Sequence, residues 1–169
     1  MKTLTRTMLI VSLIGCFTNC HSKRLSAKNN KDQIMEVKNS FQRIDDKYAA
    51  GTSLIMNRNI AYVQAPIGDF LSRIWNLYGK PTEISYEGFG YTFKDVKTGL
   101  IFTVYSAGSG PAYGGDDSNK DKLLPIITRF DNMLTVTDNA DCEITVENDF
   151  GTMKTGSKNG VPYDKMISE

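Results

Sequence analysis

The sequence is short of the residues that most often carry catalytic chemistry. It has a single histidine, His21, and only 3 cysteines. His21 lies in a polar stretch with almost nothing to bury, which cannot hold a catalytic geometry. This excludes nucleophiles activated by histidine and leaves zinc without its usual imidazole ligands. We therefore expect a protein that is not an enzyme and that has no cofactor and no metal site.

Carboxylates are missing from the first 31 residues, because all 19 of them follow Lys31. The same later part of the chain has 14 of the 20 basic residues, so it carries a net charge of about −5. Nucleic-acid phosphates are bound by concentrated positive charge. Nucleic acid is therefore excluded as an expected partner.

Apolar runs long enough to cross a bilayer are also missing. The run from Met8 to Ile14 follows a basic lead that contains Lys2 and Arg6. A helix of about ten such residues rises roughly 15 Å, which is half of a hydrocarbon core. A short basic lead with a short apolar run is typical of an export signal.

The tetrapeptide Leu13-Ile14-Gly15-Cys16 ends this run and resembles the lipobox of bacterial lipoproteins. The resemblance implies that residues 1–15 are a signal peptide and that Cys16 receives acyl chains such as palmitate, which anchor the protein firmly. Phe17 replaces the aspartate of an inner-membrane retention signal, which implies the outer membrane, facing the periplasm, in a Gram-negative source. The alternative is a plain secretory signal in which Cys16 is an ordinary apolar residue.

Residues 16–31 are polar and basic and are predicted to form a flexible tether. Its cations would each add about 1 kcal/mol of attraction to anionic headgroups if they lie near the membrane surface. The alternative is a solvated linker whose charge has no role. Residues 32–169 are then expected to form one domain.

Two helices are predicted from the spacing of apolar residues. The first covers about 32–50, where apolar residues recur every three or four positions from Ile34 to Tyr48. The second follows Pro66, ends before Gly79 and has a wide apolar face. Its face consists of Ile67, Phe70, Leu71, Ile74, Leu77 and Tyr78, with Trp75 at the edge.

Strands are predicted where apolar and polar residues alternate. Residues 89–93 and 100–105 form an antiparallel hairpin whose turn ends at Gly99. Residues 134–137 and 142–147 are expected to form a second hairpin, with Cys142 facing inward. Residues 123–130 are predicted to form a short helix with Pro125 in its first turn, or else a strand.

These elements predict an α+β fold. We expect an antiparallel sheet of four or five strands, with two or three helices packed largely on one face. Once Cys16 is lipidated, two cysteines remain. Either Cys20 and Cys142 form a disulfide with each other, or Cys20 is a free thiol and Cys142 a buried one.

Residues 106–121 are predicted to be the longest loop, because they contain 4 glycines and several polar residues. Long loops in compact domains are often functional. Tyr113, Asp116 and Asp117, with the neighbouring Tyr105, are therefore expected to bind a basic protein partner. The alternative is a disordered loop.

Other chemistry in this loop is disfavoured by its spacing. The glycines match no phosphate-binding pattern. Asp117, Asn119 and Asp121 have the spacing of a calcium loop, but Lys122 and Thr128 stand where glycine and glutamate are required. Carboxylates for glycoside hydrolysis are available beside the first predicted hairpin and at its end, but their spacing singles none of them out. They are Glu83, Glu87, Asp116 and Asp117.

Together these features predict a membrane-anchored envelope lipoprotein that acts as a non-catalytic protein-binding module. In architecture it is similar to the immunity proteins that neutralise toxin effectors in the periplasm. The alternatives are a structural or assembly lipoprotein of the envelope and a carboxylate-dependent cell-wall hydrolase.

Overall fold

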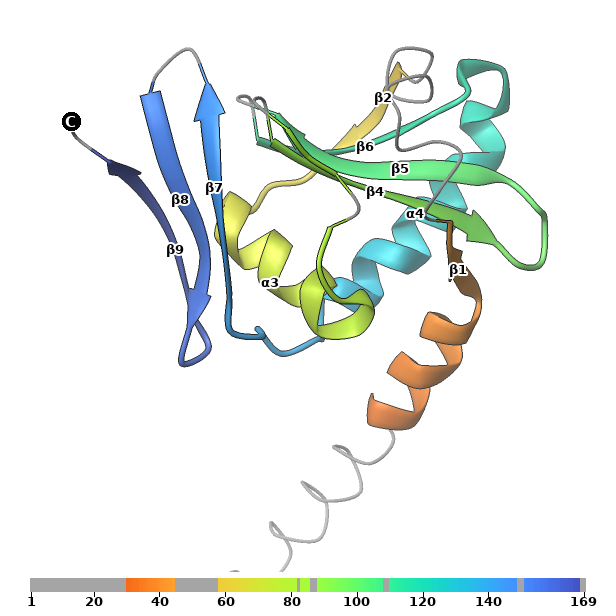
Figure 1. The fold of residues 1–169 in the computed structure, drawn as a ribbon. Helices are drawn as coiled ribbons and strands as arrows, with labels where there is room; N and C mark the ends of the chain where they lie inside the picture. The colour runs from red at the N-terminus through yellow and green to blue at the C-terminus, as the bar shows by residue number, and fades with distance from the viewer. Residues whose placement is uncertain are drawn as a thin grey trace, which may run out of the picture.

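A computed structural model describes residues 30–44, 58–81, 83–85, 88–107, 110–148 and 151–167. Two antiparallel sheets and several helices make up this part of the chain (Figure 1). Sheet A has six strands, in the order β1-β4-β5-β6-β2 with β3 also paired to β4, and sheet B has the order β7-β8-β9. The α+β prediction is confirmed, and sheet B was not expected.

Sheet A is built from strands that lie far apart in the sequence. Its members are β1 (Phe41–Arg43), β2 (Arg58–Tyr62), β3 (Glu83–Ser85), β4 (Gly88–Asp95), β5 (Ile101–Ala107) and β6 (Gly110–Gly115). The predicted hairpin is β4 and β5, and its turn ends at Gly99, whose φ of +74° favours glycine.

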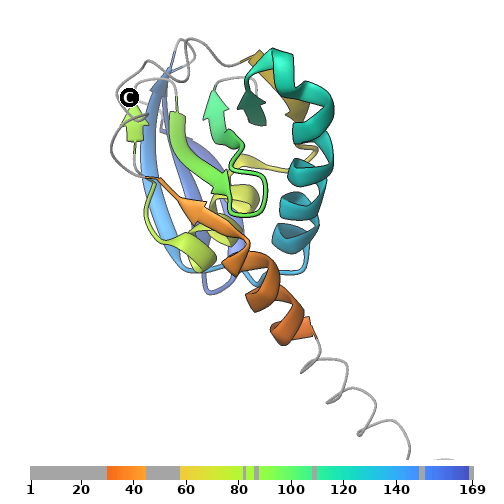
Figure 2. The ribbon, with the colours of Figure 1, turned by 90° about the vertical axis from the view of Figure 1, so that its right-hand side faces the viewer.

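The helices cover one face of sheet A. The helix α3 (Ile67–Tyr78) lies in the angle between the two sheets (Figure 1), and α4 (Lys120–Thr135) runs beside sheet A (Figure 2). A short 3-10 helix, η1 (Asp117–Asn119), leads into α4. A further helix over 30–39 precedes β1.

The predicted helix over about 32–50 is wrong at residues 40–44. Ser40 is a turn residue, and Phe41 begins β1, which pairs with β4 at Asp95. Phe41 is buried against the rings of Phe102 and Phe130. A three-residue strand is too short to show a period of its own, so its apolar residues extended the helical pattern by coincidence. Residues 45–50 lie outside the described residues.

The predicted strand over 134–137 is also wrong. Leu134 belongs to α4, whose buried stripe also contains Leu123, Ile126, Ile127 and Phe130. The helix begins at Lys120, so Pro125 lies in its second turn rather than its first.

Sheet B consists of β7 (Cys142–Asn148), β8 (Gly151–Lys158) and β9 (Val161–Ile167). The inward face of β7, with Cys142, Ile144 and Val146, is as predicted. However, β7 pairs with β8, and the hairpin between β8 and β9 turns at Asn159 and Gly160, both with positive φ.

The start of α3 packs closely against sheet B. A Cβ on Gly68 would overlap the carbonyl oxygens of Gly156 and Tyr163. Pro66 gives the helix no side-chain cap, and the carboxylate of Asp164 on β9 accepts a hydrogen bond from the Gly68 amide at 2.9 Å instead. Gly68 therefore sets how closely α3 and sheet B approach.

Replacing Gly68 with alanine is expected to destabilise the fold, although the same change in an open helix stabilises it by about 1 kcal/mol. The overlap with backbone atoms should lower the free energy of unfolding by about 2 kcal/mol and the melting temperature by about 4 to 8 °C. Thermal unfolding followed by circular dichroism measures this. Lys122→Ala, on the exposed face of α4, is the control, and equal stability of Gly68→Ala and the native chain would contradict the packing described.

Candidate functional site

The three cysteines are only partly placed by the structure. Cys16 and Cys20 lie outside the described residues, so the lipid site and the disulfide remain predictions. Cys142 is a buried thiol on β7, and its burial raises the pKa of that thiol.

Tyr113 is in the core, so the prediction that it contacts a partner is wrong. It lies on β6 opposite Val104, and its side chain is 1% exposed. Its hydroxyl donates a hydrogen bond to Asp131 Oδ1 at 2.8 Å, and its burial raises its pKa. Where a loop over 106–121 was predicted, the structure has the end of β5, then β6, η1 and the start of α4. Residues 108–109 lie outside the described residues.

Tyr105 lies on the opposite face of sheet A from Tyr113. Ala112 on β6 is paired with Tyr105 on β5 and with Tyr62 on β2. The two tyrosines therefore flank a small, buried residue on the face of sheet A opposite α3 and α4. Tyr62 is 62% exposed and Tyr105 is half-buried, which raises the pKa of Tyr105, with a smaller contribution from Tyr62.

Asp116 and Asp117 are exposed where β6 ends and η1 begins. Asp116 caps η1, because its Oδ1 accepts hydrogen bonds from the hydroxyl of Ser118 at 2.8 Å and from its amide at 2.9 Å. These bonds lower the pKa of Asp116. Asp116 follows Ala112 by four positions in the sequence, a distance of roughly 13 Å along an extended strand.

A groove between the helix over 30–39 and α4 was not predicted. Its volume is about 410 Å³. The first helix contributes Asn30, Gln33, Ile34 and Val37. The other wall consists of Pro125, Thr128, Arg129, Asn132, Met133 and Val136. A volume of this size is within the range of small-molecule sites.

Arg129 is the charged residue of this groove. Its Nη2 forms an ion pair with Asp95 Oδ1 on β4, and its guanidinium lies 4.9 Å from the centre of the Phe41 ring. Asp95 is 1% exposed, and it also accepts hydrogen bonds from Thr98, at 2.9 Å from the amide and 2.7 Å from the hydroxyl. Burial alone would raise the pKa of Asp95, but the bonds from Thr98 and the charge of Arg129 outweigh it and lower the pKa.

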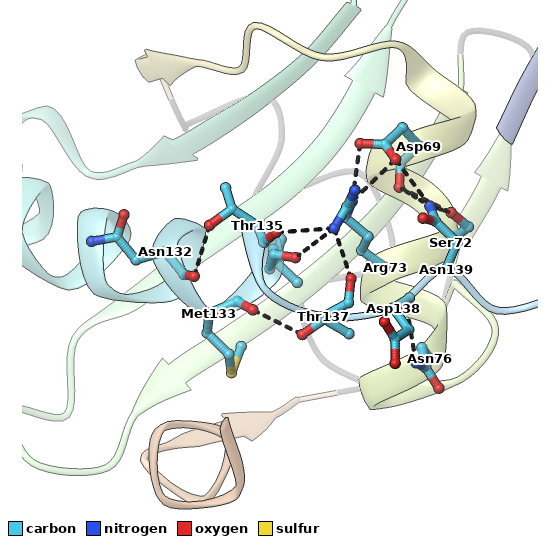
Figure 3. A network of polar contacts seen from close by, with 11 residues as sticks. Asp69, Ser72, Arg73, Asn76, Asn132, Met133, Thr135, Thr137, Asp138 and Asn139 are labelled. Carbon is cyan, nitrogen blue, oxygen red and sulfur yellow. Dashed lines mark hydrogen bonds and ion pairs between the residues drawn. The ribbon is translucent and has the colours of Figure 1, made fainter. Parts of the chain in front are cut away.

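A second arginine holds the far end of α4 in place (Figure 3). Arg73 Nη1 on α3 donates to the carbonyl oxygens of Thr135 at 3.1 Å and Thr137 at 2.7 Å, at the negative end of the α4 dipole. Its Nε donates to both carboxylate oxygens of Asp69. Because these bonds of Arg73 join α3 to the end of α4, they hold in place the groove wall that ends at Val136.

Sequence reasoning missed the groove although a signal was present. The groove residues of α4, at positions 125, 128, 129, 132, 133 and 136, recur every three or four residues, beside the buried stripe. One helix therefore carries two adjacent stripes, of which the second mixes polar and apolar residues. The partner wall over 30–39 could not be assigned, because nothing in the sequence places that helix beside α4.

Comparison of the chain with protein-family models, with curated proteins and with solved structures gives no match. Among the described residues, no group of three or more histidine, cysteine, aspartate or glutamate side chains is placed to hold a metal ion. In the same part of the chain, none of the helices combines the length and apolar character needed to cross a bilayer.

Asp95→Asn is expected to reduce stability at neutral pH by about 1 to 3 kcal/mol, because Arg129 would lose its counter-charge. The folded state lowers the pKa of Asp95, so its contribution is present above pH 4 and is lost as the pH falls through the folded-state pKa. Urea unfolding at pH 7 and pH 3 should therefore show a difference between native and variant chains that shrinks in acid. The exposed Asp138→Asn is the control. A constant difference would argue against a lowered pKa.

Proposed function

We propose that this protein is a lipid-anchored, non-catalytic binding protein of the bacterial envelope. The observation that carries the proposal is the lipobox-like tetrapeptide at residues 13–16, followed by a polar, basic tether and then by a folded α+β unit. The tetrapeptide supplies an attachment point, and the tether places the folded unit near the membrane surface. By the same resemblance, the expected location is the outer membrane, facing the periplasm.

The partner proposed for the folded unit is a basic protein. Three features support it: the net charge of about −5 from residue 32 onward, the exposed carboxylates of Asp116 and Asp117, and the tyrosines at 62 and 105 on the face of sheet A opposite α3 and α4. Tyrosine supplies contact area with little loss of side-chain entropy, and carboxylates select a partner of opposite charge. A toxin effector delivered to the periplasm is one such partner, which the chain would neutralise by occlusion.

Lipid attachment is expected at Cys16 alone. When the full chain is expressed in a bacterium supplied with labelled palmitate, the native protein should incorporate label and Cys16→Ser should not. Cys20→Ser is the matched control, since it removes a nearby cysteine outside the tetrapeptide, and it should keep the label. Label retained by Cys16→Ser, or a mature N-terminus other than Cys16 by mass spectrometry, would argue against the anchor.

Reversing the charge at Asp116 and Asp117 is expected to weaken binding of the basic partner by about tenfold or more, because like charges then meet across the interface. The partner is recovered from envelope extract on the immobilised chain, and its affinity for each variant is then measured by calorimetry. Asp138→Lys with Glu147→Lys changes the net charge equally at exposed positions elsewhere. Equal weakening by both pairs would show a general charge effect and no site at Asp116 and Asp117.

A further inference from the structure

The groove between the helix over 30–39 and α4 has two kinds of lining. Ile34, Val37, Met133 and Val136 supply an apolar strip that draws on both walls, and Val136 is 47% exposed. Asparagine, glutamine and threonine side chains lie beside the strip. A ligand that buries this strip must therefore be apolar along its length and polar at one point or one edge.

The electrostatic character of the groove comes from one residue. Arg129 is its single charged lining residue, and its side chain is 39% exposed. Asp95, which pairs with Arg129, is buried and does not line the groove. The groove therefore presents a cation to solvent while its counter-charge lies underneath.

Arg129 keeps hydrogen-bonding capacity beyond the ion pair. A guanidinium has five N–H donors, and the pair with Asp95 is made by Nη2. Nε is buried and has no hydrogen-bond partner among the described residues, so the donors that a groove ligand can meet are those of the terminal Nη nitrogens, on a side chain that is 39% exposed. A planar fork of this kind matches carboxylate and phosphate oxygens better than it matches neutral acceptors.

We propose that this groove binds an anionic amphiphile, a single alkyl chain that carries a carboxylate or phosphate head. The chain would lie along the strip from Ile34 to Val136, and the head would accept hydrogen bonds from Arg129. The exposed cation disfavours a ligand of positive charge. The volume of about 410 Å³ suits a small molecule rather than the side chains of a docked protein surface.

The position of the groove in the chain agrees with such a ligand. Asn30 lines it and is 14 residues from Cys16 in the sequence, a separation of at most about 50 Å when extended. In this respect the inference rests on the proposed function, since an anchored chain would keep the groove within reach of a membrane that supplies anionic amphiphiles.

The test is a titration of the full chain carrying Cys16→Ser, followed by the valine methyl resonances in NMR spectra. Dodecanoate, kept below its micelle concentration, should shift Val37 and Val136 in a saturable way and leave Val146 of sheet B in place. Dodecyltrimethylammonium, which has the same chain and the opposite charge, should bind at least tenfold more weakly. Tighter binding of dodecyl phosphate than of dodecanoate would indicate lipid phosphate as the source of the head group, and the reverse would indicate fatty acid.

Thr128→Glu tests the charge without removing Arg129 from its pair with Asp95. A carboxylate placed next to Arg129 in the groove should weaken dodecanoate binding at least tenfold and remove the preference over the cationic probe. Leu124→Glu adds the same charge on an exposed position of α4 that does not line the groove, and it should bind like the parent chain.

Three outcomes would overturn the proposal: no saturable shift with either anionic probe, equal affinity for the anionic and cationic probes, or equal effects of the two glutamate variants. A fourth is a shift of Val37 and Val136 with protein concentration alone, which would assign the groove to a second copy of the chain. None of these results bears on palmitate labelling or on Asp116 and Asp117, so failure here is distinguishable from failure of the proposed function.

Discussion

The packing of rings around Phe130 is the interaction on which the other features depend. This fully buried side chain of α4 contacts one ring from each of five other elements, at centroid distances of 4.9 to 6.1 Å. The five are Phe41 of β1, Tyr78 of α3, Phe93 of β4, Phe102 of β5 and Tyr113 of β6. Aromatic pairs bury large areas and favour particular ring orientations. Because α4 is held to sheet A in this way, the stripe beside its buried one is left to form the groove.

The elements that could be predicted from the sequence have a strong hydrophobic period and residues that mark their ends. In α3 the wide apolar face is bounded by Pro66 and Gly79, so both the period and the ends agree. The hairpin of β4 and β5 combines alternation with a left-handed glycine at its turn. In each case local sequence and tertiary packing favour the same conformation, which is the condition for reliable prediction.

The sequence predictions are wrong where tertiary contacts decide the role of a residue. Gly115 belongs to the predicted loop, but a Cβ there would overlap Leu123 and Ile60, so this glycine permits close packing of α4 on β6. The same loop prediction placed the buried Tyr113 on the surface. Sheet B was missed because β8 and β9 have few buried apolar residues, although Asn159 and Gly160 are a known hairpin signal. The groove depends on the contact of two helices distant in sequence, which periodicity does not encode.

In Figure 1 the helix over 30–39 projects at the lower right of the molecule, and sheet B lies on the left, with the end of β9 pointing away from this helix. A chain immobilised through residues that precede this helix would therefore hold the end of β9 away from the support. A fluorescent reporter fused after β9 would sit at that distal end, away from the groove. The height of this reporter above a supported bilayer would then measure the orientation of the molecule, independently of ligand binding at the groove or at Asp116 and Asp117.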